Sequence, residues 1–167
     1  PELLKMPRSA DVEENILARR GVPDAVRAEA LAGLAGKRNL KPVELLLATI
    51  DSPAEVDVKS VGRLLLAQTP ADLAAYRAPL LKLALSDTAE GRSYAWAAVA
   101  LADGSLDAAW NESIKSPLSQ ASLLGGIPLI PNAALRATAY ERVMSILALN
   151  ITNISGPDSI VAAIQRD

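Results

Sequence analysis

Residues 22–34 decide the fold: they read Val22-Pro23-Asp24-Ala25-Val26-Arg27-Ala28-Glu29-Ala30-Leu31-Ala32-Gly33-Leu34. The core of this stretch is an apolar residue followed by a basic, a small and an apolar residue at positions i+1, i+4 and i+8. The apolar and small positions share one stripe of a helix. The small side chain of Ala30 would let a neighbouring helix approach closely, and Leu34 would fill the seam beside it. The segment therefore predicts a helix that packs tightly against others.

The same pattern occurs four times along the chain, which points to an internal repeat. The copies are Val26-Arg27, Ala30, Leu34; Val58-Lys59, Gly62, Leu66; Gly91-Arg92, Ala95, Val99; and Leu135-Arg136, Ala139, Val143. Two copies depart from the first: Lys59 replaces the arginine in the second, and Gly91 stands where valine is expected in the third. A further amphipathic segment precedes each copy, so we expect four helix pairs that bury their apolar faces against one another, as in a solenoid. The expected repeats, within one domain over 1–167, are 9–36, 42–68, 70–103 and 105–149, with a further helix beginning in 157–167.

Local signals predict where individual helices begin and end. Gly36 is expected to end the helix that starts at Pro23. The sequence Ser52-Pro53-Ala54-Glu55 has the pattern of a capping box and predicts a helix start there. Pro79 should split the helix that Thr69-Pro70 begins, because proline lacks an N–H donor and clashes with the preceding turn. Asn132 should cap a long helix that runs to about residue 149.

The composition agrees with an all-α protein. Of 167 residues, 31 are Ala and 26 are Leu, whereas aromatic residues make up 3%. This balance favours helix over sheet. Because the chain has neither His nor Cys, zinc fingers, thiol catalysis, disulfides and His-based triads are excluded within it.

The charge gives no reason to expect a nucleic-acid or membrane partner. The net charge is −2, and residues 85–167 hold five Lys or Arg against eight Asp or Glu. A surface that binds phosphates is normally positive. The acidic second half of the chain therefore disfavours binding to DNA, and with it the function of a DNA glycosylase. No apolar run reaches the length of about 20 residues that spans a bilayer.

The first copy of the repeat resembles the second helix of a HEAT repeat. That family has an Asp shortly before a Val-Arg pair, followed by Ala and Leu on the core stripe, as seen from Asp24 to Leu34. The resemblance implies a right-handed α-α superhelix of about four helix pairs. It also implies that Asp and Arg form hydrogen-bonded ladders between repeats. The residues to which this structural role would apply are Asp24, Arg27, Lys59, Arg92 and Arg136.

A second resemblance concerns the surroundings of the repeat. The order of Arg8-Ser9-Ala10-Asp11, Ala102-Asp103-Gly104-Ser105 and the connector 127–131 is similar to the HEAT segment of certain large secreted bacterial proteins. Those proteins also contain a dehydrogenase-like propeller and a cytochrome c domain. This resemblance implies that the chain is a spacer within a longer periplasmic or secreted enzyme for redox or carbohydrate chemistry, with the catalytic domains elsewhere.

Four residues are candidates for binding a ligand or partner. Aligning the repeats places Leu31, Arg63, Trp96 and Tyr140 in one column, directly after the small residue. Trp96 could flank the core or offer a platform for stacking. Trp110, in the longer insertion before the fourth copy, could anchor a core or interface, or help to form a cage for a cation. The candidate binding residues are Trp96, Trp110, Tyr140 and Arg63.

No residue set predicts catalysis, a cofactor or a metal site. The carboxylate pairs along the chain are typical of solvated helix surfaces and helix N-termini. Arg19-Arg20 and Lys37-Arg38 with Lys41 lie near helix ends, where cations complement the helix dipole, and they are also candidates for contact with an acidic partner. We therefore expect a non-catalytic scaffold that docks proteins or neighbouring domains. An enzyme complete within these residues is the least supported hypothesis.

Overall fold

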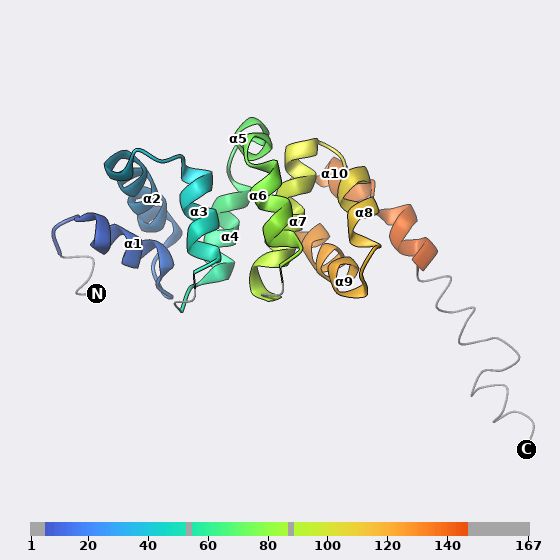
Figure 1. Ribbon diagram of the computed structural model, residues 1–167, viewed down its shortest axis with the longest axis horizontal. Coiled ribbons are helices and arrows are strands. Elements are labelled where there is room, and N and C mark those ends of the chain that lie inside the picture. The colour runs from blue at the N-terminus through green and yellow to red at the C-terminus, as the bar shows by residue number, and fades with distance from the viewer. Residues whose placement is uncertain (1–5, 53–54, 87–88, 147–167) are drawn as a thin grey trace, which may run out of the picture. The chain divides into compact units, whose positions relative to one another are not determined.

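The computed structural model describes residues 6–52, 55–86 and 89–146, and across these residues the chain is all-helical, without a strand (Figure 1). The helices are α1 (Ala10–Ala18), α2 (Asp24–Arg38), α3 (Pro42–Ile50), α4 (Val58–Leu66), α5 (Pro70–Ala75), α6 (Arg77–Ala84), α7 (Ala89–Asp103), α8 (Asp107–Ser113), α9 (Pro117–Gly126), the 3-10 helix η2 (Ile127–Leu129) and α10 (Ala133–Ala137). Residues 140–146 are also helical. The all-α prediction is confirmed for this part of the chain.

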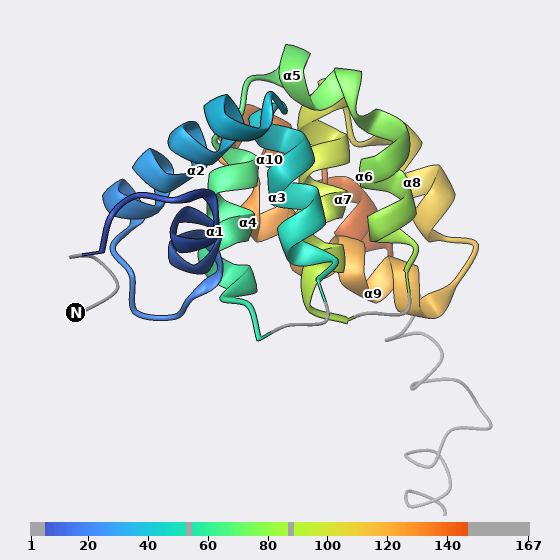
Figure 2. The same cartoon turned by 60° about the vertical axis from the view of Figure 1, so that its left-hand side comes forward.

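The chain divides into two compact units, residues 1–131 and 132–167. In the first unit, consecutive helices pack in pairs: α1 against α2, α3 against α4, and α6 against α7. The pairs also touch one another, because α3 lies against α6 and α4 lies against α7 (Figure 2). In the second unit, α10 is followed by the helical residues 140–146.

Helix α7 is the centre of the first unit. Its residues 95–100 are fully buried, including Trp96, because α4, α5, α6 and α9 surround it. A helix that is apolar on all sides has to be enclosed in this way. Four of those six residues are Ala, and these small side chains leave room for several helices to approach one axis.

The predicted close approach at the small position of the repeat is confirmed at Gly62. A Cβ atom added there would lie 2.4 Å from Cδ1 of Tyr94, so the tyrosine ring of α7 rests directly on the backbone of α4. Ala30 and Ala95, which hold the same position in their helices, are fully buried. A side chain at position 62 would therefore require the ring of Tyr94 to move.

Several predicted helix ends are confirmed. Thr69 caps α5 by accepting a hydrogen bond from the N–H of Asp72, and Asn132 caps α10 by accepting one from Leu135. The split at Pro79 is also present. The helix breaks at Tyr76, so that Pro79 falls in the first turn of α6, where the missing N–H costs no hydrogen bond.

Other predicted boundaries are wrong. Gly36 lies inside α2, and the left-handed residue that ends this helix is Asn39, with φ of 52°. Helix α4 does not start at the predicted capping box, because Asp57 provides its N-cap instead. The long helix expected after Asn132 is interrupted at residues 138–139. The helix expected from residue 157 lies outside the described residues.

Candidate functional site

The four candidate binding residues do not form one site in the structure. Trp96 is fully buried in α7, which agrees with a core-flanking role and leaves no face of its ring for a ligand. Trp110 is partly buried in α8, whereas Tyr140 is 67% exposed and belongs to the second unit. Arg63 is half-exposed on α4. Of the four, only Arg63 belongs to the polar network described next.

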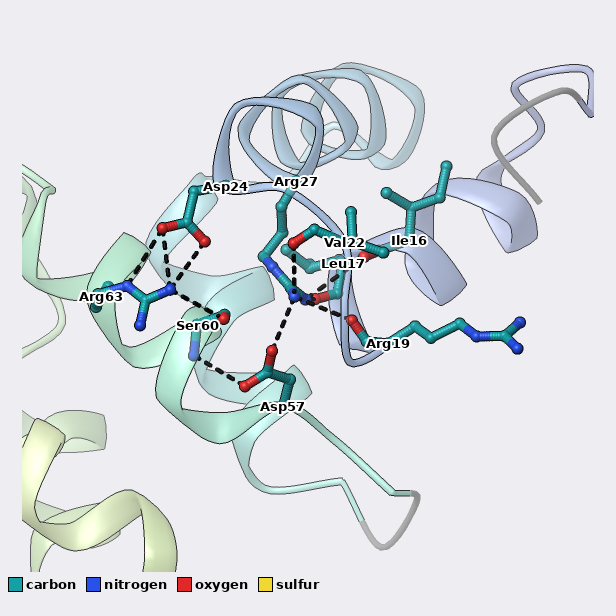
Figure 3. Close-up of polar contacts among 9 residues, drawn as sticks. All are labelled: Ile16, Leu17, Arg19, Val22, Asp24, Arg27, Asp57, Ser60 and Arg63. Atoms are coloured by element: carbon teal, nitrogen blue, oxygen red, sulfur yellow. Dashed lines mark hydrogen bonds and ion pairs between the residues drawn. The ribbon is translucent and has the colours of Figure 1, made fainter. Parts of the chain in front are cut away.

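Arg27 is the centre of a buried polar network at the C-terminal end of α1 (Figure 3). Its side chain is fully buried, and its guanidinium donates hydrogen bonds to the backbone oxygen atoms of Leu17, of Arg19 at 2.9 Å and of Val22 at 3.4 Å. The last carbonyls of a helix have no partner within it and carry partial negative charge. Arg27 therefore caps α1 from the neighbouring helix α2.

The same guanidinium reaches the next helix pair. Nη2 of Arg27 lies 3.0 Å from Oδ2 of Asp57, the N-cap residue of α4. The carboxylate of Asp57 also accepts a hydrogen bond from the backbone N–H of Ser60, and its own N–H donates to the carbonyl oxygen of Ala18 at 2.8 Å. The end of α1 and the start of α4 are thus joined, directly and through Arg27.

Burial and charge shift the pKa values of this pair. Burial lowers the pKa of Arg27, although the nearby carboxylates of Asp57 and Asp24 oppose the shift. Burial alone would raise the pKa of Asp57, but the hydrogen bonds from Ser60, together with the charge of Arg27, outweigh it, so this pKa lies below its ordinary value. Both groups are charged at neutral pH.

A second ion pair joins α2 to α4 beside the first. Nη2 of Arg63 lies 3.0 Å from both carboxylate oxygens of Asp24 and donates to the hydroxyl of Ser60 at 3.1 Å. The hydrogen bonds to Asp24 raise the pKa of Arg63. Because both side chains are about half-exposed, solvent screens this pair more than it screens Arg27 and Asp57.

Arg92 occupies in α7 the place that Arg27 occupies in α2. It is buried and donates to the carbonyl oxygen of Ser86, just beyond the end of α6, at 3.3 Å. Arg27 bonds carbonyl oxygens at the end of α1, whereas Arg92 bonds a carbonyl oxygen in the segment that follows α6. Lys59, at the corresponding position of α4, is exposed. The link between successive repeats that was expected of these residues is present at Arg27, through Asp57. The hydrogen bond from Arg92 to Ser86 stays within its own pair.

Two adjoining hollows lie beside this network. The first has a volume of about 390 Å³ and is lined by Arg20, Val56, Asp57, Val58, Lys59 and Tyr94. The second has a volume of about 370 Å³ and is lined by Asn15, Ala18, Arg19, Arg20 and Glu55. The hollows share Arg20, and three cations, Arg19, Arg20 and Lys59, line them. The doublet Arg19-Arg20 was visible in the sequence, but the pattern did not indicate that α4 would bring Lys59 to it.

In the basic cluster of Lys37, Arg38 and Lys41, two of the three charges are paired with carboxylates. Nζ of Lys37 lies 2.6 Å from Oε2 of the buried Glu13, and Arg38 forms an ion pair with Glu14. These contacts fasten α2 to α1. Lys41 is exposed, and no ion pair to it is present in the described part of the chain. The region around Arg19, Arg20 and Lys59 is thus the better candidate for contact with an acidic partner.

Among the described residues, no group of three or more His, Cys, Asp or Glu side chains is placed to hold a metal ion. No helix within residues 6–52, 55–86 and 89–146 has the length and hydrophobicity to cross a membrane.

Comparison with known proteins finds no matching family model, no matching curated protein and no matching solved structure. The function has to be argued from the contacts themselves.

Proposed function

We propose that this chain is a non-catalytic, HEAT-like helical-repeat scaffold that docks a protein partner or a neighbouring domain. The observation that carries the proposal is the equivalence of Arg27 and Arg92. Each lies at the basic position of the repeat, is buried in the second helix of a pair, and donates a hydrogen bond to a backbone carbonyl oxygen at the end of the first helix or in the segment just after it. A recurring contact of this kind is what a stacked array of similar helix pairs requires.

The use of the charged residues also supports a scaffold. Three ion pairs with a partly or fully buried partner connect one helix to another: Arg27 to Asp57, Lys37 to Glu13, and Arg77 to Asp103 with oxygen–nitrogen distances of 2.6 and 2.8 Å. Groups committed to such pairs hold helices in place rather than reacting with a substrate. The second helices of the pairs, α2 and α4, keep exposed residues on which a partner can rest.

The proposal is tested by site-specific photo-crosslinking of the protein in its own cells. A benzoylphenylalanine is placed at Ala28 on α2 or at Arg63 on α4, with Lys82 on α6 as the control position. All three side chains are exposed or half-exposed. We expect crosslinks from positions 28 and 63 to one protein segment, and no such product from position 82.

Two results would overturn the proposal. One is the absence of a discrete crosslinked product from any of the three positions. The other is a specific reaction catalysed by the purified chain and lost on a single substitution that leaves the fold intact. Support further requires that the crosslinked partner, once purified, binds the chain again with a measurable Kd. A crosslink to another segment of the same polypeptide would identify a spacer between domains.

A further inference from the structure

We infer that the two hollows joined at Arg20 form a docking site for an acidic segment of a protein partner. This inference rests on the proposed scaffold function and specifies the chemistry of what the scaffold binds. Arg19 and Arg20 come from the end of α1, and Lys59 comes from the first turn of α4. Three cations from two helix pairs therefore face one region of the surface.

The cations are available for an external anion. Arg19 and Lys59 are exposed, and the described residues offer neither of them an ion pair. The carboxylate of Asp57, which also lines the first hollow, is already balanced by Arg27 at 3.0 Å. The positive charge at this site thus exceeds the negative charge that the protein itself supplies.

Glu55 shows how a partner carboxylate would bind. Its Oε1 lies 3.6 Å from Nη1 of Arg20, with 80% of the Glu55 side chain and 69% of the Arg20 side chain exposed. An ion pair as exposed as this contributes little stability. An incoming carboxylate can therefore replace Glu55 at Arg20, and Glu55 acts as an internal competitor for the site.

The size of the site favours a peptide over a small ion. The hollows measure about 390 and 370 Å³ and meet at Arg20. Lys59 lines one hollow, Arg19 lines the other and Arg20 lines both, a distribution that suits an extended acidic segment.

The test is a binding titration of the full chain with fluorescein-labelled hexaglutamate, followed by fluorescence anisotropy at low ionic strength. We expect K59Q and R20Q each to weaken binding about threefold to tenfold, and E55Q to strengthen it about twofold, as expected for exposed charge pairs. K41Q is the matched control, because it removes an exposed cation away from the site, and it should leave the Kd unchanged. Hexaglutamine should not bind.

The inference is overturned if hexaglutamate does not bind, or if K41Q weakens binding as much as K59Q does. It is also overturned if inorganic phosphate displaces the peptide at equal charge concentration, which would indicate a simple anion site. Binding to anionic phosphatidylserine vesicles that depends on Lys59, without peptide binding, would indicate a lipid surface instead. Thermal unfolding of each variant verifies that its fold is intact.

The scaffold function and this site can fail separately. If crosslinking from position 63 to a partner persists unchanged in the K59Q variant, the scaffold stands and this docking site is wrong. If no position crosslinks but hexaglutamate binds as described, the site stands and the scaffold function is wrong.

Discussion

Arg27 of α2 lies 3.0 Å from Asp57 at the start of α4, and the same guanidinium caps the end of α1. One fully buried side chain therefore joins three helices from two consecutive pairs. An ion pair of this kind stabilises little relative to apolar packing, yet removing Asp57 would leave the fully buried guanidinium of Arg27 without a counter-charge. The contact consequently fixes how the first two pairs are arranged.

Replacing Arg27 by Met should lower the free energy of unfolding by about 3–5 kcal/mol, because Asp57 and the last carbonyls of α1 lose their partner. R63M is the matched control on the second ion pair. Since Arg63 and Asp24 are half-exposed, its cost should be only about 0–1 kcal/mol. Urea unfolding followed by circular dichroism measures both. Equal losses in the two variants would contradict the difference in burial.

Asp57 should make stability depend on pH on the acid side. Its pKa in the folded protein lies below the ordinary value of 3.8, so its contribution is present above that value. The contribution is lost as the pH falls through the lower folded-state pKa. In D57N this dependence is absent, and the difference in unfolding free energy between the wild type and D57N should shrink below about pH 4. A difference that grows as the solution is acidified would show that the shift has the opposite sign.

Replacing Gly62 or Gly36 by Ala should change stability in opposite directions, although both glycines lie within helices. In G62A the new Cβ would lie 2.4 Å from the ring of Tyr94, and such overpacking costs about 1–3 kcal/mol. In G36A nothing lies within 4 Å of the new atom, so the variant should be stabilised by about 0.5–1 kcal/mol. Thermal unfolding measures both. Stabilisation of G62A would show that α4 and α7 are not in close contact.

The two tryptophans should differ in fluorescence. Trp96 is fully buried, whereas Trp110 is partly exposed, and the chain has no other Trp. W110F therefore reports on Trp96 alone, and we expect a blue-shifted emission that acrylamide quenches weakly. W96F reports on Trp110 and should be quenched more strongly. If Trp96 were quenched as readily as Trp110, the ring would be open to solvent and its role as a stacking platform would stand.

The sequence carried most of the information about helix content and much less about how charged side chains are used. The stripe of Ala30 and Leu34 and the break before Pro79 follow from local geometry, and both are present. Pro53 and Ala54 of the predicted capping box lie outside the described residues, but residues 55–57 are not helical, and Asp57, which is also paired with Arg27, caps α4 instead. That pairing depends on the distance between helices, which no local pattern contains.

The repeat pattern also did not predict which of the candidate binding residues are exposed. One column of the repeat contained Arg63, Trp96 and Tyr140, but equal positions in a pattern are not equally exposed. Trp96 falls on α7, which other helices enclose, while Arg63 remains at the surface. Lys59 departs from the arginine of the repeat, and that departure was the one local signal that this position is not a buried cap.

We propose that the chain is an array of stacked helix pairs rather than a domain with one cooperative core. Hydrogen exchange followed by mass spectrometry, on the wild type and on R27M, distinguishes the two, because stability in an array is set by neighbouring contacts. We expect R27M to lose amide protection in α1, α2 and α4, while α9 keeps the protection of the wild type. A uniform loss of protection from α1 to α9 would contradict it.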